Sequence, residues 1–250
     1  HDFNDFEVGK RHQLEIINIF DQFAKINENA PSKFHGLDRF EARKLILEEL
    51  KDLNLLIKEE KQDMVVPYGD RSGVIIEPWL TDQWFCNAKK LSIDPIKTVK
   101  EGKTNFVPKN WENTFFNWME NIQPWCISRQ LWWGHQIPAW YGPDNKSFVA
   151  LSQEDAKLMA KNHYGKEVEL KQDEDVLDTW FSSALWTFST LDWPNNTYEL
   201  DRFYPGNVLV TGFDIIFFWV ARMMMMGSHF MKETPFKDIY IHPLIRDEKG

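Results

Sequence analysis

The stretch NVLVTGFDIIFFWVARMMMM, from Asn207 to Met226, decides how the rest of the chain must fold. Its aliphatic and β-branched run at 208–210 predicts a short strand. The following Thr211-Gly212-Phe213 predicts a tight turn, because glycine adopts backbone conformations that reverse a chain sharply. The apolar run after the turn predicts a helix, so the stretch indicates an α/β unit of strand, turn and helix.

Asp214 stands at the start of the predicted helix, where a carboxylate would cap unpaired backbone N–H groups. Ile215, Trp219 and Met223 follow at a spacing of four residues, so we expect them along one face. A ligand over the carboxyl end of the strand would meet the acid and this apolar wall, at the place where open α/β sheets bind ligands. The alternative is a buried unit whose aspartate only caps the helix.

The composition of the 250 residues indicates a packed protein with stacking surfaces, because 15% are aromatic and 12 are Trp. Asp214 and Arg222 interrupt the apolar run, which falls short of the roughly 20 residues of a membrane span.

The net charge of −9 gives no sign of a nucleic-acid partner, although a basic stripe can lie on an acidic protein. Cys86 and Cys126 form no metal-binding cluster, which predicts reduced thiols without structural zinc. Without a signal peptide, the cytoplasm is the expected location.

The two ends of the chain suggest an internal fragment of a longer protein. The chain opens with HDFND, without an initiator methionine, and closes with HPLIRDEKG, where a strand would have just delivered a charged loop. We therefore expect further sequence on both sides.

The sequence of a first region, 1–76, predicts two helices with short strands around them. One helix is expected at 6–12, and Asp38 with Glu41 predicts the capping box of a second. The second helix would bury a stripe of Ala42, Ile46, Leu50 and Leu53. Strands are expected at 15–20, 25–27, 55–58, 64–66 and 74–76, with turns at Asp21-Gln22 and at 68–73.

Asp2 and Asp5, beside His1, are the candidate chemical group of this region. The alternative is a solvated helix start, where the helix dipole would stabilise each carboxylate by about 0.3–1 kcal/mol.

A second region, residues 77–250, carries helices predicted at 111–122 and 153–162 and a possible strand at 167–170. The sequence 175–181 predicts a strand that ends at Ser182-Ser183, where a helix to Thr190 would begin. The segment 125–138 sets polar residues such as Ser128, Arg129 and His135 among tryptophans, so they must reach a cleft or buried partners. No GxSxG, Walker loop or GxGxxG is present, which gives no support for the enzymes that use them.

Four sequence blocks together resemble the class I aminoacyl-tRNA synthetases of the valine, isoleucine and leucine group, with the valine enzymes the most similar. The blocks are HDFNDFEVGKRH at 1–12, WCISRQLWWGHQIPAWY at 125–141, DVLDTWFSSALW at 175–186 and TGFDIIFFWVARMM at 211–224. The similarity continues through GLDRFEAR at 36–43 and RSGVIIEPWLTDQWF at 71–85. Their combination in this order is highly specific, whereas DTWFSS alone also occurs in isoleucine enzymes.

The resemblance implies an α/β fold: the second half of a class I Rossmann-like catalytic domain, preceded by the carboxyl-terminal part of a β-rich editing insertion. Residues 1–76 would belong to the editing insertion. Residues 77–250 would belong to the catalytic domain, with a connecting insertion at about 142–174.

The resemblance also implies roles for individual residues. In the synthetic site Trp180, Ile215 and Trp219 resemble the walls of the valine pocket, and Asp214 resembles the catalytic acid next to the adenylate. Gly212 and His242 would lie near the nucleotide, although Pro243 replaces the glycine that usually follows such a histidine.

In the editing pocket Asp5 resembles the acid that holds the α-ammonium group of the amino acid, with Asp2 beside it. The implied parent enzyme would activate valine with ATP, with Mg²⁺ expected, and transfer it to tRNA(Val). It would also hydrolyse threonyl-tRNA(Val), and we expect a monomer that is not bound to membranes.

Several family features are missing from this sequence. His-Ile-Gly-His and Lys-Met-Ser-Lys-Ser are absent, so the fragment alone is not expected to activate an amino acid. The zinc-binding cysteines of many relatives are absent from residues 141–174, which predicts no metal there. The alternatives are an isoleucyl-tRNA synthetase, or a non-catalytic descendant that binds tRNA or serves as a scaffold.

Overall fold

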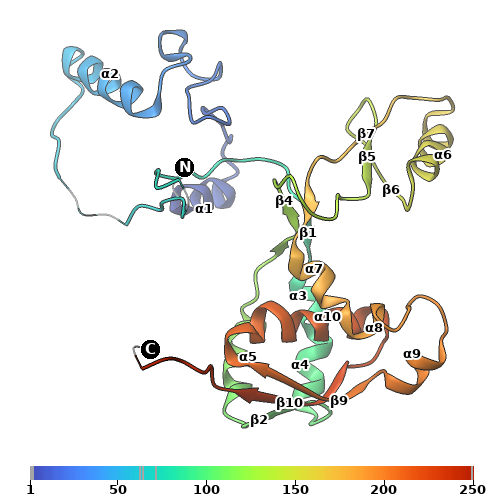
Figure 1. Ribbon diagram of the computed structural model, residues 1–250. Helices are drawn as coiled ribbons and strands as arrows, with labels where there is room; N and C mark the ends of the chain where they lie inside the picture. The colour runs from blue at the N-terminus through green and yellow to red at the C-terminus, as the bar shows by residue number, and fades with distance from the viewer. Residues whose placement is uncertain (1–2, 62, 64, 71, 249) are drawn as a thin grey trace. The chain divides into compact units, whose positions relative to one another are not determined.

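The computed structural model describes residues 3–61, 63, 65–70, 72–248 and 250, so His1 and the editing candidate Asp2 lie outside the described residues. The chain divides into two compact units, residues 1–82 and 83–250. Each unit is described by itself below, with the element labels of Figure 1.

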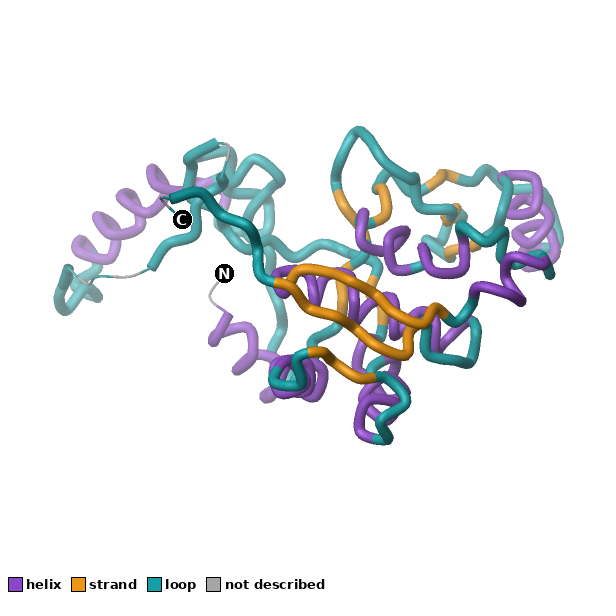
Figure 2. Tube along the Cα trace, turned by 60° about the horizontal axis from the view of Figure 1, so that its bottom comes forward, coloured by secondary structure: helices purple, strands orange, loops and turns teal. Residues whose placement is uncertain are grey.

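The second unit is built on a parallel sheet of three strands, β2 (Asn105–Val107), β10 (Phe236–His242) and β9 (Gly206–Gly212), in that order. Figure 2 shows β9 and β10 side by side. Parallel neighbours need a crossover, and here the helical segment after β9 supplies it. One face of the sheet is buried through Phe106, Leu209, Ile239 and Ile241. The predicted α/β unit is confirmed, and its strand is longer than the expected 208–210.

The segment after β9 is less regular than the sequence predicts. It makes a 3₁₀ turn η2 (Phe213–Ile215) and a π-helical turn η3 (Ile216–Val220) before the helix α10 (Ala221–Phe230). Asp214 lies inside η2 and makes no side-chain cap there, so the N-cap prediction is wrong.

Gly212 has a φ of −74° and is extended, so the turn does not require glycine for its backbone conformation, and that part of the prediction is wrong. A Cβ at this position would lie 2.4 Å from Oδ1 of Asp214 and 3.2 Å from Cδ2 of Leu244. Any larger residue here would therefore require the Asp214 carboxylate to move.

Ile215, Trp219 and Met223 do not share one helix face as expected, because they differ in burial. Met223 is fully buried, whereas Ile215 and Trp219 are only half-buried. Ile216 and Val220 face the core in their place. A π-helical turn inserts a wider i to i+5 step, which shifts the register that a regular helix would keep.

Helices α3 (Ala88–Leu91), α4 (Ile93–Lys100) and α5 (Trp111–Glu120) enclose the same core as α10. The prediction of a helix at 111–122 is confirmed. Its aromatic side chains stack on those of the segment after β9: Trp118 on Phe217 with ring centroids 5.0 Å apart, and Trp111 on Phe213 at 5.5 Å. These contacts hold the irregular turns against α5.

A small three-stranded sheet forms a separate core within the second unit. Its strands are β5 (Ala139–Tyr141), β6 (Ser147–Val149) and β7 (Lys171–Gln172), and α6 (Gln153–Tyr164) packs beside them. The predicted helix at 153–162 is confirmed, whereas the strand expected at 167–170 is wrong, because the strand β7 covers only Lys171–Gln172, directly after that range. The buried residues are Trp140, Phe148, Ala156, Ala160 and Leu170.

Two short antiparallel pairs connect these bodies: β1 (Phe85–Cys86) with β3 (Trp125–Cys126), and β4 (Ser128–Arg129) with β8 (Val176–Leu177). Helices α7 (Thr179–Ala184), α8 (Trp186–Ser189) and α9 (Tyr198–Phe203) follow. The predicted strand 175–181 is therefore wrong beyond Leu177. The cap of the helix is Asp178, which accepts a hydrogen bond from the backbone N–H of Trp180, and not the serine pair.

In the first unit, α1 (Phe3–His12), the 3₁₀ turn η1 (Ser32–Phe34) and α2 (Arg39–Asp52) are the regular elements. The helix prediction at 6–12 is confirmed, and so is Asp38 as the N-cap of α2, where it accepts a hydrogen bond from the backbone N–H of Phe40 at 2.8 Å. The predicted stripe of α2 is wrong, because only Ala42 is buried while Ile46 and Leu53 are exposed.

The strands expected in the first unit are not formed among its described residues, and only isolated bridges occur there, such as Phe20 to Ile26 and Tyr68 to Ile75. Of the segment 64–66, residue 64 lies outside the described part. A mostly buried ion pair from Arg39 to Glu77, at 3.3 Å, connects the start of α2 to the end of the unit. The unit therefore depends on polar contacts and on a small core of Ile26, Phe34 and Ala42.

Both cysteines are free thiols, as expected. Cys86 is opposite Trp125 and Cys126 is opposite Phe85, so the two thiols point to different faces of their ribbon. None of the described helices is long and apolar enough to cross a membrane.

Candidate functional site

The carboxyl edge of the parallel sheet brings together three residues that the sequence singled out. Gly212 and His242 are register partners at the ends of the neighbouring strands β9 and β10. Asp214 follows Gly212 by two residues and is exposed. The ring Nδ1 of His242 lies 2.8 Å from the carbonyl oxygen of Pro243. An acid and an imidazole therefore lie at the edge where sheets of this type bind ligands.

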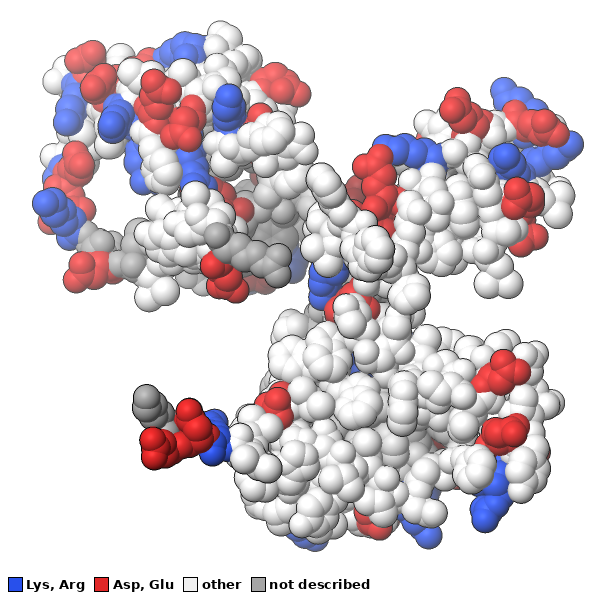
Figure 3. Space-filling view, in the orientation of Figure 1, with Lys and Arg blue, Asp and Glu red and all other residues white. Residues whose placement is uncertain are grey.

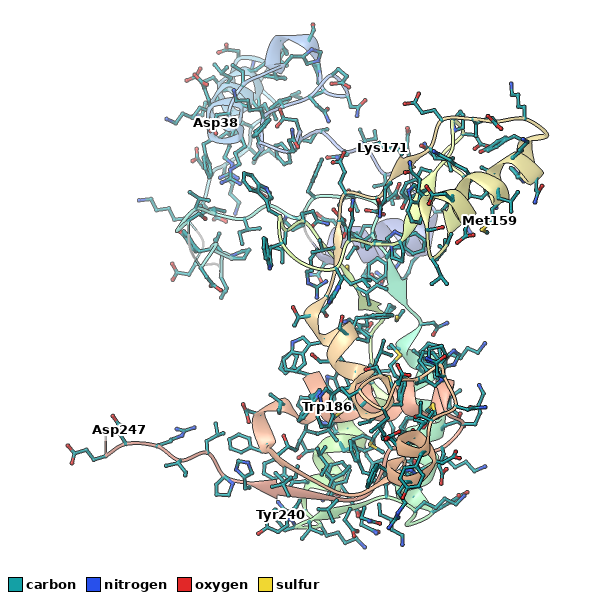
Figure 4. The ribbon with its side chains drawn as sticks, turned by 45° about the vertical axis from the view of Figure 1, so that its right-hand side comes forward. Asp38, Met159, Lys171, Trp186, Tyr240 and Asp247 are labelled. Carbon is teal, nitrogen blue, oxygen red and sulfur yellow. The ribbon has the colours of Figure 1, made fainter. Side chains whose placement is uncertain are left out.

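An aromatic wall lies between α7 and the π-turn η3. The ring of Trp180 stacks on Phe218, with centroids 5.6 Å apart and planes 29° from parallel. Trp219 donates its indole N–H to the carbonyl oxygen of Ser183 at 3.1 Å and lies 6.1 Å from Trp186. Trp186, labelled in Figure 4, is among the helices of this unit. The fold thus joins Trp180 and Trp219 through one short helix.

Ile215 is the last residue of η2, four positions before Trp219, and is half-buried. The visible face of the α/β body that carries these elements has few charged side chains (Figure 3). An apolar amino-acid side chain would find dispersion contacts on such a wall, while a charged one would lose hydration without a partner.

A buried carboxylate that the sequence analysis missed lies beneath this wall. Asp178 is 5% exposed, and its Oδ2 lies 3.0 Å from Nη2 of Arg129 and 3.4 Å from Nη1 of Arg222. Burial lowers the pKa of Arg222, and the negative charge of Asp178 opposes that change. The signal available in the sequence was an aspartate directly before a helix, which predicts an N-cap and not the ion cluster.

The first unit contains a cavity of about 450 Å³ that includes Asp5. Asp5 comes from the first turn of α1, and two further segments, 16–20 and 78–80, complete the lining. The lining residues are Asp5, Phe6, Glu7, Gly9, Ile16, Ile17, Asn18, Ile19, Phe20, Pro78, Trp79 and Leu80. The indole of Trp79 donates a hydrogen bond to the carbonyl oxygen of Phe20 at 3.3 Å, which closes one side.

Within the described part of the chain, no three His, Cys, Asp or Glu side chains are arranged to hold a metal ion. The Mg²⁺ expected with ATP stays a prediction, because this ion is usually held by substrate phosphates together with one or two carboxylates.

By sequence, known proteins match the chain along nearly all of its length. The family model for tRNA synthetases class I (I, L, M and V) matches residues 3–250. The valine–tRNA ligase of Pelagibacter ubique is 64% identical and that of Caulobacter vibrioides 60% identical, each over 250 residues and all of this chain. The chain spans 29% and 28% of the length of these curated relatives. Methionyl-tRNA synthetase of Mycobacterium tuberculosis bound by methionyl-adenylate aligns with a TM-score of 0.47 and 16% identity, over 73% of this chain and 30% of that one.

Proposed function

Because the chain belongs to the class I tRNA synthetases of the isoleucine, leucine, methionine and valine family, we propose that it is part of a valine–tRNA ligase. The parent enzyme would join valine to ATP as valyl-adenylate, release pyrophosphate and pass the valyl group to tRNA(Val). The observation that carries this proposal is the identity of 64% and 60%, along all 250 residues, to two proteins named valine–tRNA ligase.

Residues 83–250 would supply the second half of the activation site. Asp214, exposed at the carboxyl edge of the sheet, would bind a cationic or hydroxyl group of the substrates. Gly212 and His242, paired at the same edge, would border the nucleotide. A site of this kind accelerates the reaction by positioning the reactants and by placing fixed charges where charge develops.

The aromatic wall would select the amino acid. Trp180, Ile215 and Trp219 are half-buried, so part of the apolar surface of each side chain remains accessible to a ligand. Side chains larger than an isopropyl group would be excluded by overlap. Such a wall cannot reject threonine well, since an apolar pocket discriminates against an isostere with one added hydroxyl by only about 10²-fold, a figure established on valine enzymes.

We propose that the first unit belongs to a second, hydrolytic site that removes threonine from tRNA(Val). The support is the cavity that contains Asp5, because a carboxylate in an otherwise largely apolar recess can bind the α-ammonium group of an aminoacyl ester. Threonine differs from valine by a hydroxyl, so this site can accept what the synthetic site fails to exclude.

The deciding experiment is amino-acid-dependent exchange of pyrophosphate into ATP by the full-length protein that contains this chain. We expect rapid exchange with valine and far slower exchange with isoleucine. Faster exchange with isoleucine would assign the protein to the isoleucine enzymes. Absence of exchange with any amino acid, together with retained binding of tRNA(Val), would instead identify a non-catalytic descendant.

A further inference from the structure

The carboxylate of Asp178 joins four elements of the second unit. Its Oδ1 accepts the backbone N–H of Trp180 at 3.2 Å and so caps α7. Its Oδ2 accepts the indole N–H of Trp125, in β3, at 2.8 Å. The same oxygen pairs with Arg129 of β4 and Arg222 of α10.

The guanidinium group of Arg222 extends this cluster to the aromatic wall. It lies 4.0 Å from the ring centroid of Trp125 and 5.8 Å from that of Phe218. Phe218 in turn stacks on Trp180. Trp180 is therefore held twice by Asp178, through its own backbone N–H and through the arginine that contacts its stacking partner.

Capping alone does not explain an aspartate here. Ser152 caps α6 and Thr197 caps α9 with neutral hydroxyl groups, so this fold starts helices without a charge. Only a carboxylate can cap α7 and also neutralise two guanidinium groups. Stability alone does not explain it either, because an apolar cluster of similar volume stabilises a core as well as a buried ion pair does. The charges add a fixed geometry. A planar guanidinium donates its N–H groups to a carboxylate oxygen in only a few orientations, so the ion pairs fix how the joined elements are oriented.

We propose that Asp178 is a positioning residue for amino-acid selection, because it fixes the start of α7 against the start of α10. Helix α7 carries Trp180, and its Ser183 carbonyl oxygen accepts the indole N–H of Trp219, which lies in the turn η3 directly before α10. Asp178 thereby sets the separation of the two indoles and the side chain that fits between them. The inference rests on the proposed function, in which this wall receives valine.

The test is Asp178→Asn in the full-length protein, which keeps a capping oxygen and removes the charge. We expect kcat/KM for valine to fall on the order of 10²-fold, the size of effect that a displacement of about 1 Å can cause. The fall should lie mainly in KM for valine, KM for ATP should stay unchanged, and the preference for valine over isoleucine should shrink. The control is Asp38→Asn, which alters the same type of cap, to Phe40, in the first unit.

Arg222→Lys is the second variant, for the case that Asp178→Asn does not fold. It keeps the buried charge but removes the planar fork, and we expect the same changes in smaller amount, with KM for valine raised and the preference for valine reduced. A variant that folds and loses only kcat, with KM for valine and the preference unchanged, overturns the inference. Wild-type protein that fails to exchange pyrophosphate with valine overturns the proposed function itself, and this arm needs no variant.

Discussion

Trp219 donates its indole hydrogen to the backbone carbonyl oxygen of Ser183 at 3.1 Å, and this bond joins the π-turn η3 to α7. The side chain is half-buried and also packs near Trp186, with ring centroids 6.1 Å apart. Trp219 therefore combines two properties of a pocket wall: a large apolar surface and a fixed orientation.

Trp219→Ala should widen the proposed valine pocket and increase the use of isoleucine. One methylene in such a pocket is worth about 1–3 kcal/mol of discrimination, so the preference for valine should fall by about 10-fold or more. The measurement is pyrophosphate exchange with valine and with isoleucine. Trp219→Phe is the matched control, because it keeps most of the apolar bulk and removes only the hydrogen bond to Ser183. An unchanged preference in Trp219→Ala would remove this residue from the pocket.

The sequence predicts regular helices and the parallel unit well where periodicity extends over many residues. The expected helices at 111–122 and 153–162 are formed and are 10 and 12 residues long, so each extends over about three turns. The short apolar runs of the first unit were assigned to strands, and only isolated bridges occur there. A run of three to six residues carries too little periodicity to separate a strand from an extended loop.

In the candidate site, too, the sequence indicates single residues but not the contacts between residues that are far apart in the chain. His242 was singled out by the family resemblance, and the structure places it at the end of β10, opposite Gly212. The cluster around Asp178 could not be predicted, since Arg222 is 44 residues away along the chain and only the fold brings the two charges to 3.4 Å. The helix start was also misplaced, because the serine pair at 182–183 offered an equally good cap by residue type.

Gly212→Ala should disturb the carboxyl edge of the sheet. The added methyl would lie 2.4 Å from Oδ1 of Asp214 and 3.2 Å from Leu244, so the carboxylate must move. We expect valine-dependent pyrophosphate exchange to fall on the order of 10²-fold. Gly206→Ala, at the other end of β9, is the control, because its nearest contact would be an ordinary 3.5 Å. Equal activity of the two variants would show that Asp214 is not positioned for the reaction.

Asp5→Ala should impair removal of threonine while leaving valine activation intact. The carboxylate lies in the cavity of the first unit, and its loss would remove the proposed partner of the α-ammonium group. The measurement is accumulation of threonyl-tRNA(Val) by the full-length protein. Glu7→Ala is the matched control, because Glu7 is a second acid that lines the same cavity. We expect a smaller effect, since the resemblance assigns the α-ammonium group to Asp5. Continued clearance of threonyl-tRNA(Val) by Asp5→Ala would exclude Asp5 from the editing role.

The stability of the second unit should fall at alkaline pH as Tyr141 loses its proton. Burial, followed by the hydrogen bond that its hydroxyl donates to Asp173 at 2.7 Å, raises the pKa of Tyr141 from 10.0 to about 12. A raised pKa in the folded state favours the protonated form, so this contribution to stability is complete below pH 10 and is lost as the pH rises to about 12. Urea unfolding of the chain at pH 9 and near pH 12 should therefore show a loss that Tyr141→Phe reduces. Asp173→Asn removes the charged acceptor and should lower the pKa of Tyr141. The absorbance of the Tyr141 phenolate, followed during a pH titration, measures this change. If Tyr141→Phe loses as much stability as the wild type over this range, the hydroxyl of Tyr141 does not supply the pH dependence.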